Sequence, residues 1–128
     1  MNTKASLSVL AALLALTVTA PVQAATVVCS GTIDWLQFDA TSTGGLFSIK
    51  LSSMNVAVYF CDPDNSFTGA GSGYSISAAT CRSLYATFLA AKVSGTPVTN
   101  MYFDGSSVPA TCDGWAAWQS ANIRHYYF

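Results

Sequence analysis

The chain contains one histidine, His125, and it lies within the last four residues. Hydrolytic or acid–base catalysis needs a group that titrates near neutral pH, usually a histidine or a pair of carboxylates. Serines are frequent, but the nucleophile-elbow pattern G-x-S-x-G does not occur in the sequence. A late histidine in an alternating segment is typical of a strand surface. We therefore predict no catalytic residue and no enzymatic activity.

The stretch DPDNS places Asp62, Asp64 and Ser66 at the spacing that opens a calcium-binding loop. Such a loop needs glycine at its sixth position and a bidentate glutamate at its twelfth. This chain has Phe67 and Gly73 at those positions. The stretch therefore predicts a turn in which an aspartate side chain accepts backbone N–H groups. We predict no metal site and no cofactor.

Three tryptophans offer a different chemistry, because aromatic rings fill protein cores and also stack against the faces of sugar rings. Trp35 alternates with Ile33 in a strand-like segment, so we expect it in the core. Trp115 and Trp118 follow a loop near the C-terminus. We expect one of these two to be exposed.

Residues 1–24, MNTKASLSVLAALLALTVTAPVQA, have the pattern of a cleaved secretory signal. Lys4 provides the basic start, an apolar run follows, and Val22-Gln23-Ala24 ends the segment with small residues at the cleavage positions. The apolar run is short and soon interrupted by Pro21, which predicts no membrane span; an uncleaved anchor is the alternative. We predict an exported protein, periplasmic or secreted, with one domain over residues 25–128.

The predicted mature chain carries four basic residues against six aspartates, hence a net charge of −2, and it has no glutamate. Nucleic-acid binding depends on cations that neutralise phosphates. So few cations make a nucleic-acid partner a poor fit. The many aromatic residues and the low charge also argue against disorder.

Alternation and turn residues divide residues 25–128 into five strands and one helix. The expected strands are 25–40, 46–54, 55–61, 97–103 and 115–128. A turn is expected at 41–45, and within 46–54 Phe47, Ile49 and Leu51 share one face.

The helix is expected to begin after Ser77, a suitable N-cap, and to end at Gly95, where a left-handed conformation suits glycine. Cys81, Leu84, Tyr85 and Phe88 recur at helical spacing and predict one buried stripe.

The resulting order, β-β-β-α-β-β, is that of the OB-fold, a small five-stranded Greek-key barrel. The helix would close the open end of such a barrel. A small β-sandwich with an inserted helix is the alternative fold.

All four cysteines lie in the predicted mature domain, an even number that predicts two disulfides in an exported protein. Three pairings can be drawn from four cysteines. The element order favours Cys61–Cys81, which clamps the loop before the helix, together with Cys29–Cys112, which joins the first and last strands. Each bond would stabilise the fold by about 3–5 kcal/mol on the chain-entropy model.

The ordered motifs CSG…QF…VYFC…SISAATC…SLYATF…SGTPVTNMYF cover about residues 29–104. They resemble the B subunits of subtilase cytotoxin and typhoid toxin, the glycan-binding OB-fold subunits of pentameric bacterial toxins. The resemblance implies a glycan-binding, lectin-like module whose partner is a host or bacterial surface glycan, sialylated in that family. It also implies a homopentamer with a separate catalytic subunit.

Motif-to-motif matching with this family places the glycan contacts on Ser30 and Tyr102. A serine hydroxyl can hydrogen-bond a sugar carboxylate, and a tyrosine adds a ring face. The positions of Cys29 and Cys112 and the segment 115–128 depart from the family pattern. The alternative function is therefore an exported, disulfide-stapled structural or interaction domain without a sugar site or enzymatic activity.

Overall fold

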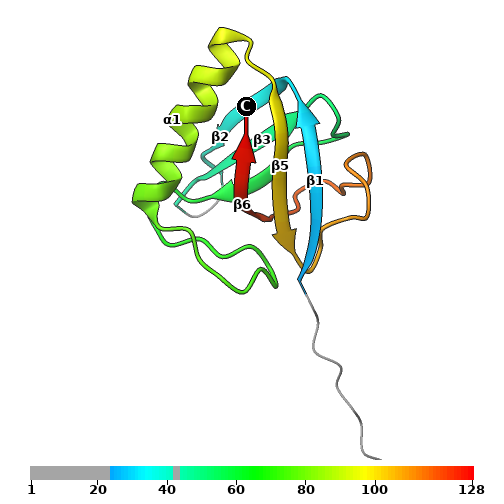
Figure 1. Ribbon diagram of the computed structural model, residues 1–128. Coiled ribbons are helices and arrows are strands. Elements are labelled where there is room, and N and C mark those ends of the chain that lie inside the picture. The colour runs from blue at the N-terminus through cyan, green and yellow to red at the C-terminus, as the bar shows by residue number, and fades with distance from the viewer. Residues whose placement is uncertain (1–23, 42–43) are drawn as a thin grey trace, which may run out of the picture.

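The structure is a computed structural model that describes residues 24–41 and 44–128. Apart from Ala24, the predicted signal segment lies outside the described residues, as does the middle of the turn expected at 41–45. The elements in chain order are β1 (Ala25–Gly31), β2 (Ile33–Asp39), β3 (Leu46–Leu51), β4 (Val58–Cys61), α1 (Ala78–Ser94), β5 (Val98–Gly105) and β6 (Asn122–Tyr127), as shown in Figure 1.

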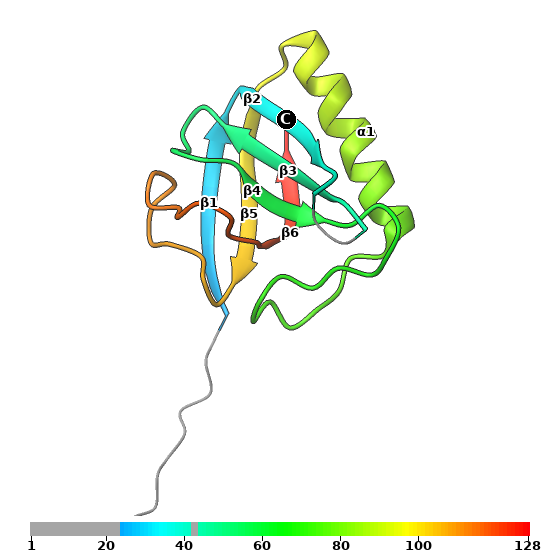
Figure 2. The same cartoon turned by 180° about the vertical axis from the view of Figure 1, so that it is seen from behind.

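The strands form two antiparallel three-stranded sheets, β1-β5-β6 and β2-β3-β4. Figures 1 and 2 show the two sheets packed face to face, with α1 along one side of both. The prediction of a mainly β protein with one helix is confirmed. The sheets connect at one edge through the chain itself, where β1 runs into β2. At another point only an isolated parallel bridge joins them, between Tyr59 and Ser120.

The single strand expected over 25–40 is wrong, because the chain bends between β1 and β2 and passes from one sheet to the other. Gly31 lies at this bend with a φ of 120°, a conformation open to glycine but strained for residues with a Cβ. The element order is consequently β-β-β-β-α-β-β.

Trp35 is not in the core as expected; its side chain is 57% exposed. Ile33 pairs with Leu51, but Trp35 pairs with Lys50. An advance of two residues along β2 therefore matches an advance of one residue along β3. An extra residue of this kind turns the following side chains to the opposite face of the sheet. Simple alternation from the buried Ile33 therefore assigns Trp35 to the wrong face.

The core lies between the two sheets and under the helix. Its members from β1, β5 and β6 include Val27, Cys29, Met101, Phe103 and Ile123, and those from β3 and β4 include Ile49, Leu51, Val58 and Phe60. The predicted shared face of Phe47, Ile49 and Leu51 points toward this core, since Ile49 and Leu51 are buried and Phe47 packs against Phe60.

The helix agrees with its prediction at both ends. Ser77 Oγ accepts a hydrogen bond from the Thr80 backbone N–H at 3.2 Å, which caps the first turn. Gly95 has a φ of 71°, the left-handed conformation expected after the last turn. Cys81 and Phe88 are fully buried, so the predicted apolar stripe faces the core.

Three predicted strands are shorter than expected, since residues 52–54 and the loops 55–57 and 115–121 lie outside β3, β4 and β6. Asn55 connects these loops: its Nδ2 donates to the Trp115 carbonyl at 2.7 Å, and its Oδ1 accepts from the Trp115 backbone N–H at 3.1 Å. The Asn55 side-chain amide thus hydrogen-bonds to the Trp115 backbone N–H and carbonyl, the groups that would pair with a neighbouring strand in a sheet. Trp115 itself is buried, 2% exposed, against Phe103.

Two disulfides join Cys29 to Cys112 and Cys61 to Cys81, with Cα–Cα distances of 5.6 and 5.5 Å. This is the pairing that the element order favours. One bond connects β1 to the loop before β6, and the other connects β4 to α1. Within the described part of the chain, α1 is too short and too polar to cross a bilayer, and it is the one helix there.

Candidate functional site

Three polar side chains form a row across the outer face of the β2-β3-β4 sheet. Ser48 on β3 is the register partner of both Gln37 on β2 and Tyr59 on β4. Their neighbours along the strands, Ile49 and Val58, are buried on the inner face. Two strand spacings give the row a length of about 10 Å.

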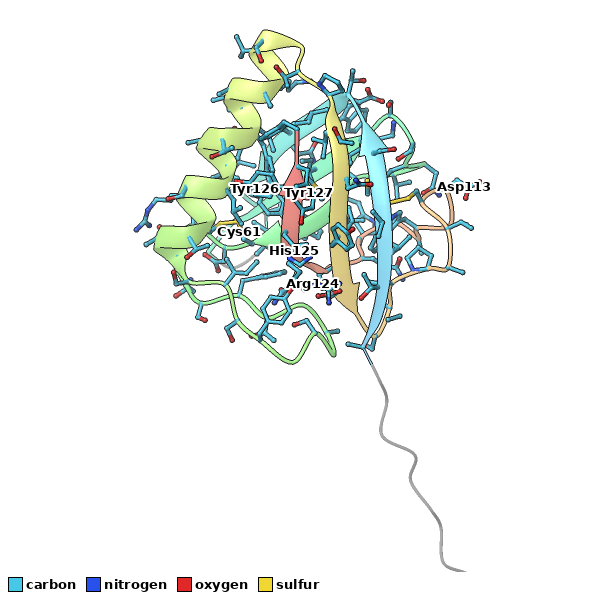
Figure 3. All side chains as sticks on the ribbon, in the orientation of Figure 1. Cys61, Asp113, Arg124, His125, Tyr126 and Tyr127 are labelled. Carbon is cyan, nitrogen blue, oxygen red and sulfur yellow. A yellow bond between two sulfur atoms is a disulfide. The ribbon has the colours of Figure 1, made fainter. Side chains whose placement is uncertain are left out.

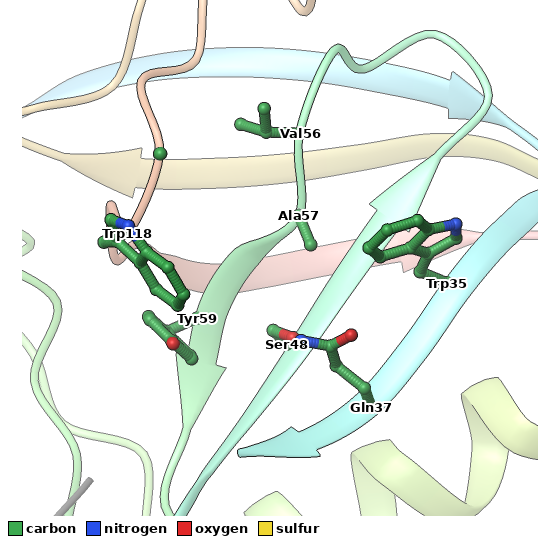
Figure 4. A pocket seen from close by; sticks show the side chains of 8 residues that line it. Trp35, Gln37, Ser48, Val56, Ala57, Tyr59 and Trp118 are labelled. Carbon is green, nitrogen blue, oxygen red and sulfur yellow. The ribbon is translucent and has the colours of Figure 1, made fainter. Parts of the chain in front are cut away.

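Two tryptophans lie at opposite ends of this row. Figure 4 shows Trp35 near Gln37, further along β2, and Trp118 above Tyr59, with Ser48 and Gln37 between the two rings. The hollow between the indole rings has a cavity volume of about 150 Å³, and Val56, Ala57 and Ala117 complete its walls. We call this site the tryptophan cleft. It is smaller than an enclosed ligand pocket, which suits a flat ring held across an open surface.

Trp118 is held in an unusual conformation for its exposure. It is 76% exposed, and its φ of 65° is the left-handed value that bulky residues avoid. Its ring stacks on Tyr59 with the ring centroids 6.2 Å apart and the planes 24° apart. Strained backbone of this kind concentrates at functional sites, where the surrounding structure keeps it in place.

Ser48 lies at the centre of the row and is 2% exposed. Its Oγ has no hydrogen-bond partner among the described residues, although Ser48 lines the cleft. A buried hydroxyl normally finds a partner, because leaving it unpaired costs free energy. The Ser48 hydroxyl is therefore an unsatisfied polar group in the floor of the cleft.

The Tyr59 hydroxyl is oriented by Asp39, to which it donates a hydrogen bond. The same carboxylate accepts from the Thr41 backbone N–H at 2.9 Å and from Thr41 Oγ1 at 2.6 Å. Desolvation, reinforced by the Asp39 carboxylate, raises the pKa of Tyr59 to about 12. The hydrogen bonds from Thr41 and Tyr59 lower the pKa of Asp39. Tyr59 is thus neutral and Asp39 ionised at neutral pH.

The residues that line the cleft carry no formal charge. Lys50, the register partner of Trp35, places a cation beside the cleft. Its ammonium contacts Asp34 Oδ2 at 3.0 Å, and this hydrogen bond is the main reason that the pKa of Asp34 is lowered. The cleft therefore combines aromatic faces, one free hydroxyl and one amide without an unpaired ionic group in its lining.

The predicted residues Ser30 and Tyr102 lie on the other sheet. Tyr102 on β5 is the register partner of Val28 on β1, and Ser30 lies two residues after Val28, where the register of β1 against β5 shifts. The Ser30 backbone N–H donates to Ser53 Oγ at 3.3 Å.

Tyr102 is surrounded by side chains of β6, which Figure 3 shows at the centre of the molecule. The Arg124 guanidinium lies 5.6 Å from the centre of the Tyr102 ring, and the His125 ring lies 4.6 Å from it. Arg124 also forms an ion pair with Asp104 at 3.5 Å. His125 is exposed, in agreement with its predicted position on a strand surface.

The aspartates of the calcium-like stretch form the predicted turn. Asp62 Oδ1 accepts hydrogen bonds from the backbone N–H groups of Asp64 and Asn65 at 2.7 and 2.9 Å. Across residues 24–41 and 44–128, no three acidic, histidine or cysteine side chains converge to hold a metal ion.

Sequence reasoning missed Gln37, Ser48 and Tyr59 as site residues and misplaced Trp35. The outward position of Ser48 opposite Phe47 and Ile49 was readable from alternation. The register shift in β2 and the approach of Trp118 to Tyr59 left no signal in the sequence, because both depend on contacts between distant segments.

Comparisons of the chain with protein-family models, curated proteins and solved structures give no match. The resemblance to toxin B subunits therefore rests on the ordered motifs alone.

Proposed function

We propose that this protein is an exported glycan-binding domain and that a sugar ring binds in the tryptophan cleft. The observation that carries the proposal is the pair of exposed indole rings, Trp35 and Trp118, on either side of an unpaired buried hydroxyl, Ser48 Oγ. Sugars offer apolar C–H faces for stacking and hydroxyl edges for hydrogen bonds. The cleft supplies both kinds of contact within one hollow.

The arrangement of strands supports an OB-type barrel for this domain. When β1 and β2 are counted as one bent strand, β3 to β6 become strands two to five. The Tyr59–Ser120 bridge is parallel and places β4 beside the start of β6. OB-folds bind oligonucleotides and oligosaccharides on strands two and three and on the loop before strand five. Ser48, Tyr59 and Trp118 occupy these positions. The acidic net charge favours the saccharide.

Export is supported by the two disulfides, which are a feature of exported proteins. The signal-like residues 1–24 point in the same direction. We propose that the domain acts in the periplasm or outside the cell, where surface glycans are accessible.

The toxin resemblance supports a second contact face at Ser30 and Tyr102, suited to a sialylated glycan. Arg124 beside Tyr102 supplies a cation for an acidic sugar, although Asp104 already pairs with it. The same resemblance implies a homopentamer with a separate catalytic subunit. Sedimentation of the purified protein tests this assembly, and a monomer would favour the structural or interaction role.

The test is a glycan array probed with the oxidised protein and with the variant Trp118→Asn. Asparagine tolerates the left-handed backbone at this position, so the fold is retained while the indole is removed. We expect glycan binding by the wild-type protein and a loss of at least about tenfold in the variant. Val93→Ala, an exposed apolar change on α1, is the matched control and should bind as wild type.

Ser30→Ala and Tyr102→Phe separate the two faces. Loss of binding in these variants with full binding in Trp118→Asn would move the site to the β1-β5-β6 sheet. Absence of glycan binding by correctly oxidised wild-type protein would overturn the proposed function and favour a structural or interaction domain.

A further inference from the structure

The charged residues around the tryptophan cleft affect which ligands it can bind. Its lining residues are uncharged, and Lys50 beside it is paired with Asp34. At the other end, the ionised Asp39 lies directly behind the Tyr59 hydroxyl. A carboxylate on the ligand would meet the negative charge of Asp39 and no unpaired cation to offset it.

Ser48 determines which group of the ligand enters the centre of the cleft. Its hydroxyl can donate one hydrogen bond and accept others. A sugar hydroxyl has the same capacity, so one hydroxyl of the ligand can satisfy Ser48 Oγ. Ser48 is the small residue in a row between Gln37 and Tyr59, and its unpaired hydroxyl is buried in the floor of the cleft.

The ends of the cleft constrain the shape of the ligand. Trp35 and Trp118 stand at opposite ends of a row about 10 Å long. The cavity between them holds about one ring, while each indole extends the apolar surface beyond it. The arrangement fits a ring with neighbours on both sides, as in a chain of sugars laid across the three strands.

We propose, building on the glycan-binding function, that the cleft recognises a neutral oligosaccharide, one of whose ring hydroxyls hydrogen-bonds to Ser48 Oγ, and that acidic sugars bind there poorly. Ser48 is the specificity-determining residue of the site. Gln37, beside it in the row, offers a further donor and acceptor to the same ring. This ligand class differs from the sialylated glycan that the toxin resemblance implies for Ser30 and Tyr102.

The experiment uses the oxidised Ser30→Ala/Tyr102→Phe variant, in which the second proposed face is disabled, and measures its binding to neutral oligosaccharides and to the same oligosaccharides extended with sialic acid or a uronic acid. We expect tighter binding of the neutral set, with an affinity that changes little with salt because no ion pair is formed. Preference for the acidic set, or an affinity that falls steeply with salt, would overturn the inference while leaving the glycan-binding function in place. No binding to either set would overturn both.

Ser48→Ala provides the second measurement. Removing an unpaired buried hydroxyl leaves the free energy of unfolding unchanged or raises it, so the variant should remain folded. Its affinity for the neutral oligosaccharide should fall between about threefold and tenfold. Ser107→Ala, an exposed serine in the loop after β5, is the control. Unchanged affinity in Ser48→Ala would remove Ser48 from the site.

Discussion

Tyr59 connects the tryptophan cleft to the segment after β2 through a single hydroxyl group. The hydroxyl donates to Asp39, and Asp39 in turn holds Thr41, so the side chain at the base of the cleft is fixed from behind. Trp118 then stacks on a ring whose orientation is already set. At the scale of single residues, the cleft therefore consists of groups held in place before a ligand arrives.

Burial of Tyr59 together with its contact to Asp39 predicts a late tyrosine titration. Desolvation first, and then the Asp39 carboxylate, raises the pKa of Tyr59 to about 12, above its ordinary value of about 10. The stability that depends on a neutral Tyr59 is therefore fully present below pH 10 and is lost as the pH rises from about 10 to about 12. In Asp39→Asn we expect the pKa of Tyr59 to fall toward 10 without reaching it, because burial remains. Tyrosinate absorbance measured against pH checks this.

Tyr59→Phe is the control for that titration, since it removes the late-titrating hydroxyl. Tyr74, whose pKa burial and Asp104 also raise, remains in both variants as an internal reference. An unchanged titration in Asp39→Asn would show that Asp39 does not act on Tyr59.

Among the elements, the loop between β4 and α1 is attached to β6 by one buried amide. Asn122 is fully buried; its Oδ1 accepts from the Gly69 N–H at 2.7 Å and its Nδ2 donates to the Tyr74 carbonyl at 2.6 Å. The loop approaches so closely that a Cβ on Gly69 would lie 2.8 Å from the Asn122 backbone nitrogen. A main-chain neighbour cannot move aside as a side chain can.

We therefore expect Gly69→Ala to lower the free energy of unfolding by about 2 kcal/mol or more, because the loop must shift away from β6. Gly73→Ala is the matched control in the same loop: its φ is 80°, but no atom lies within 4 Å of an added Cβ. Gly73→Ala should lower the free energy of unfolding by about 1 kcal/mol, because only backbone strain is introduced. Urea denaturation measures both free energies of unfolding. Equal losses in the two variants would contradict the close approach of Gly69 to the Asn122 backbone.

For the whole molecule, the two disulfides connect different elements of the fold. Cys29–Cys112 closes a separation of 83 residues and fixes the loop that carries Trp118 to β1. Cys61–Cys81 closes 20 residues and fixes α1 to β4. A domain of this size has a total stability of about 5–15 kcal/mol, so each bond is a large share of it.

The double variant Cys29→Ser/Cys112→Ser should lose about 4–5 kcal/mol of unfolding free energy, and Cys61→Ser/Cys81→Ser about 3 kcal/mol, because the longer loop restricts the unfolded chain more. Urea denaturation of the oxidised proteins measures the difference. The reverse order of stabilities would contradict this entropic account. The first variant should also bind glycan more weakly, since the loop with Trp118 loses its attachment to β1.

Local sequence determined the parts of this protein that local physics controls. Ser77 and Gly95 predicted the limits of α1, because capping depends on residues within one turn, and alternation placed Ser48 opposite the buried Ile49. Only the tertiary structure decided the rest. The bend at Gly31 and the register shift after Ile33 turn Trp35 outward, and the segment before β6 brings Trp118 onto Tyr59. Pairing between segments far apart in the chain creates these contacts, and no pattern within either segment encodes them.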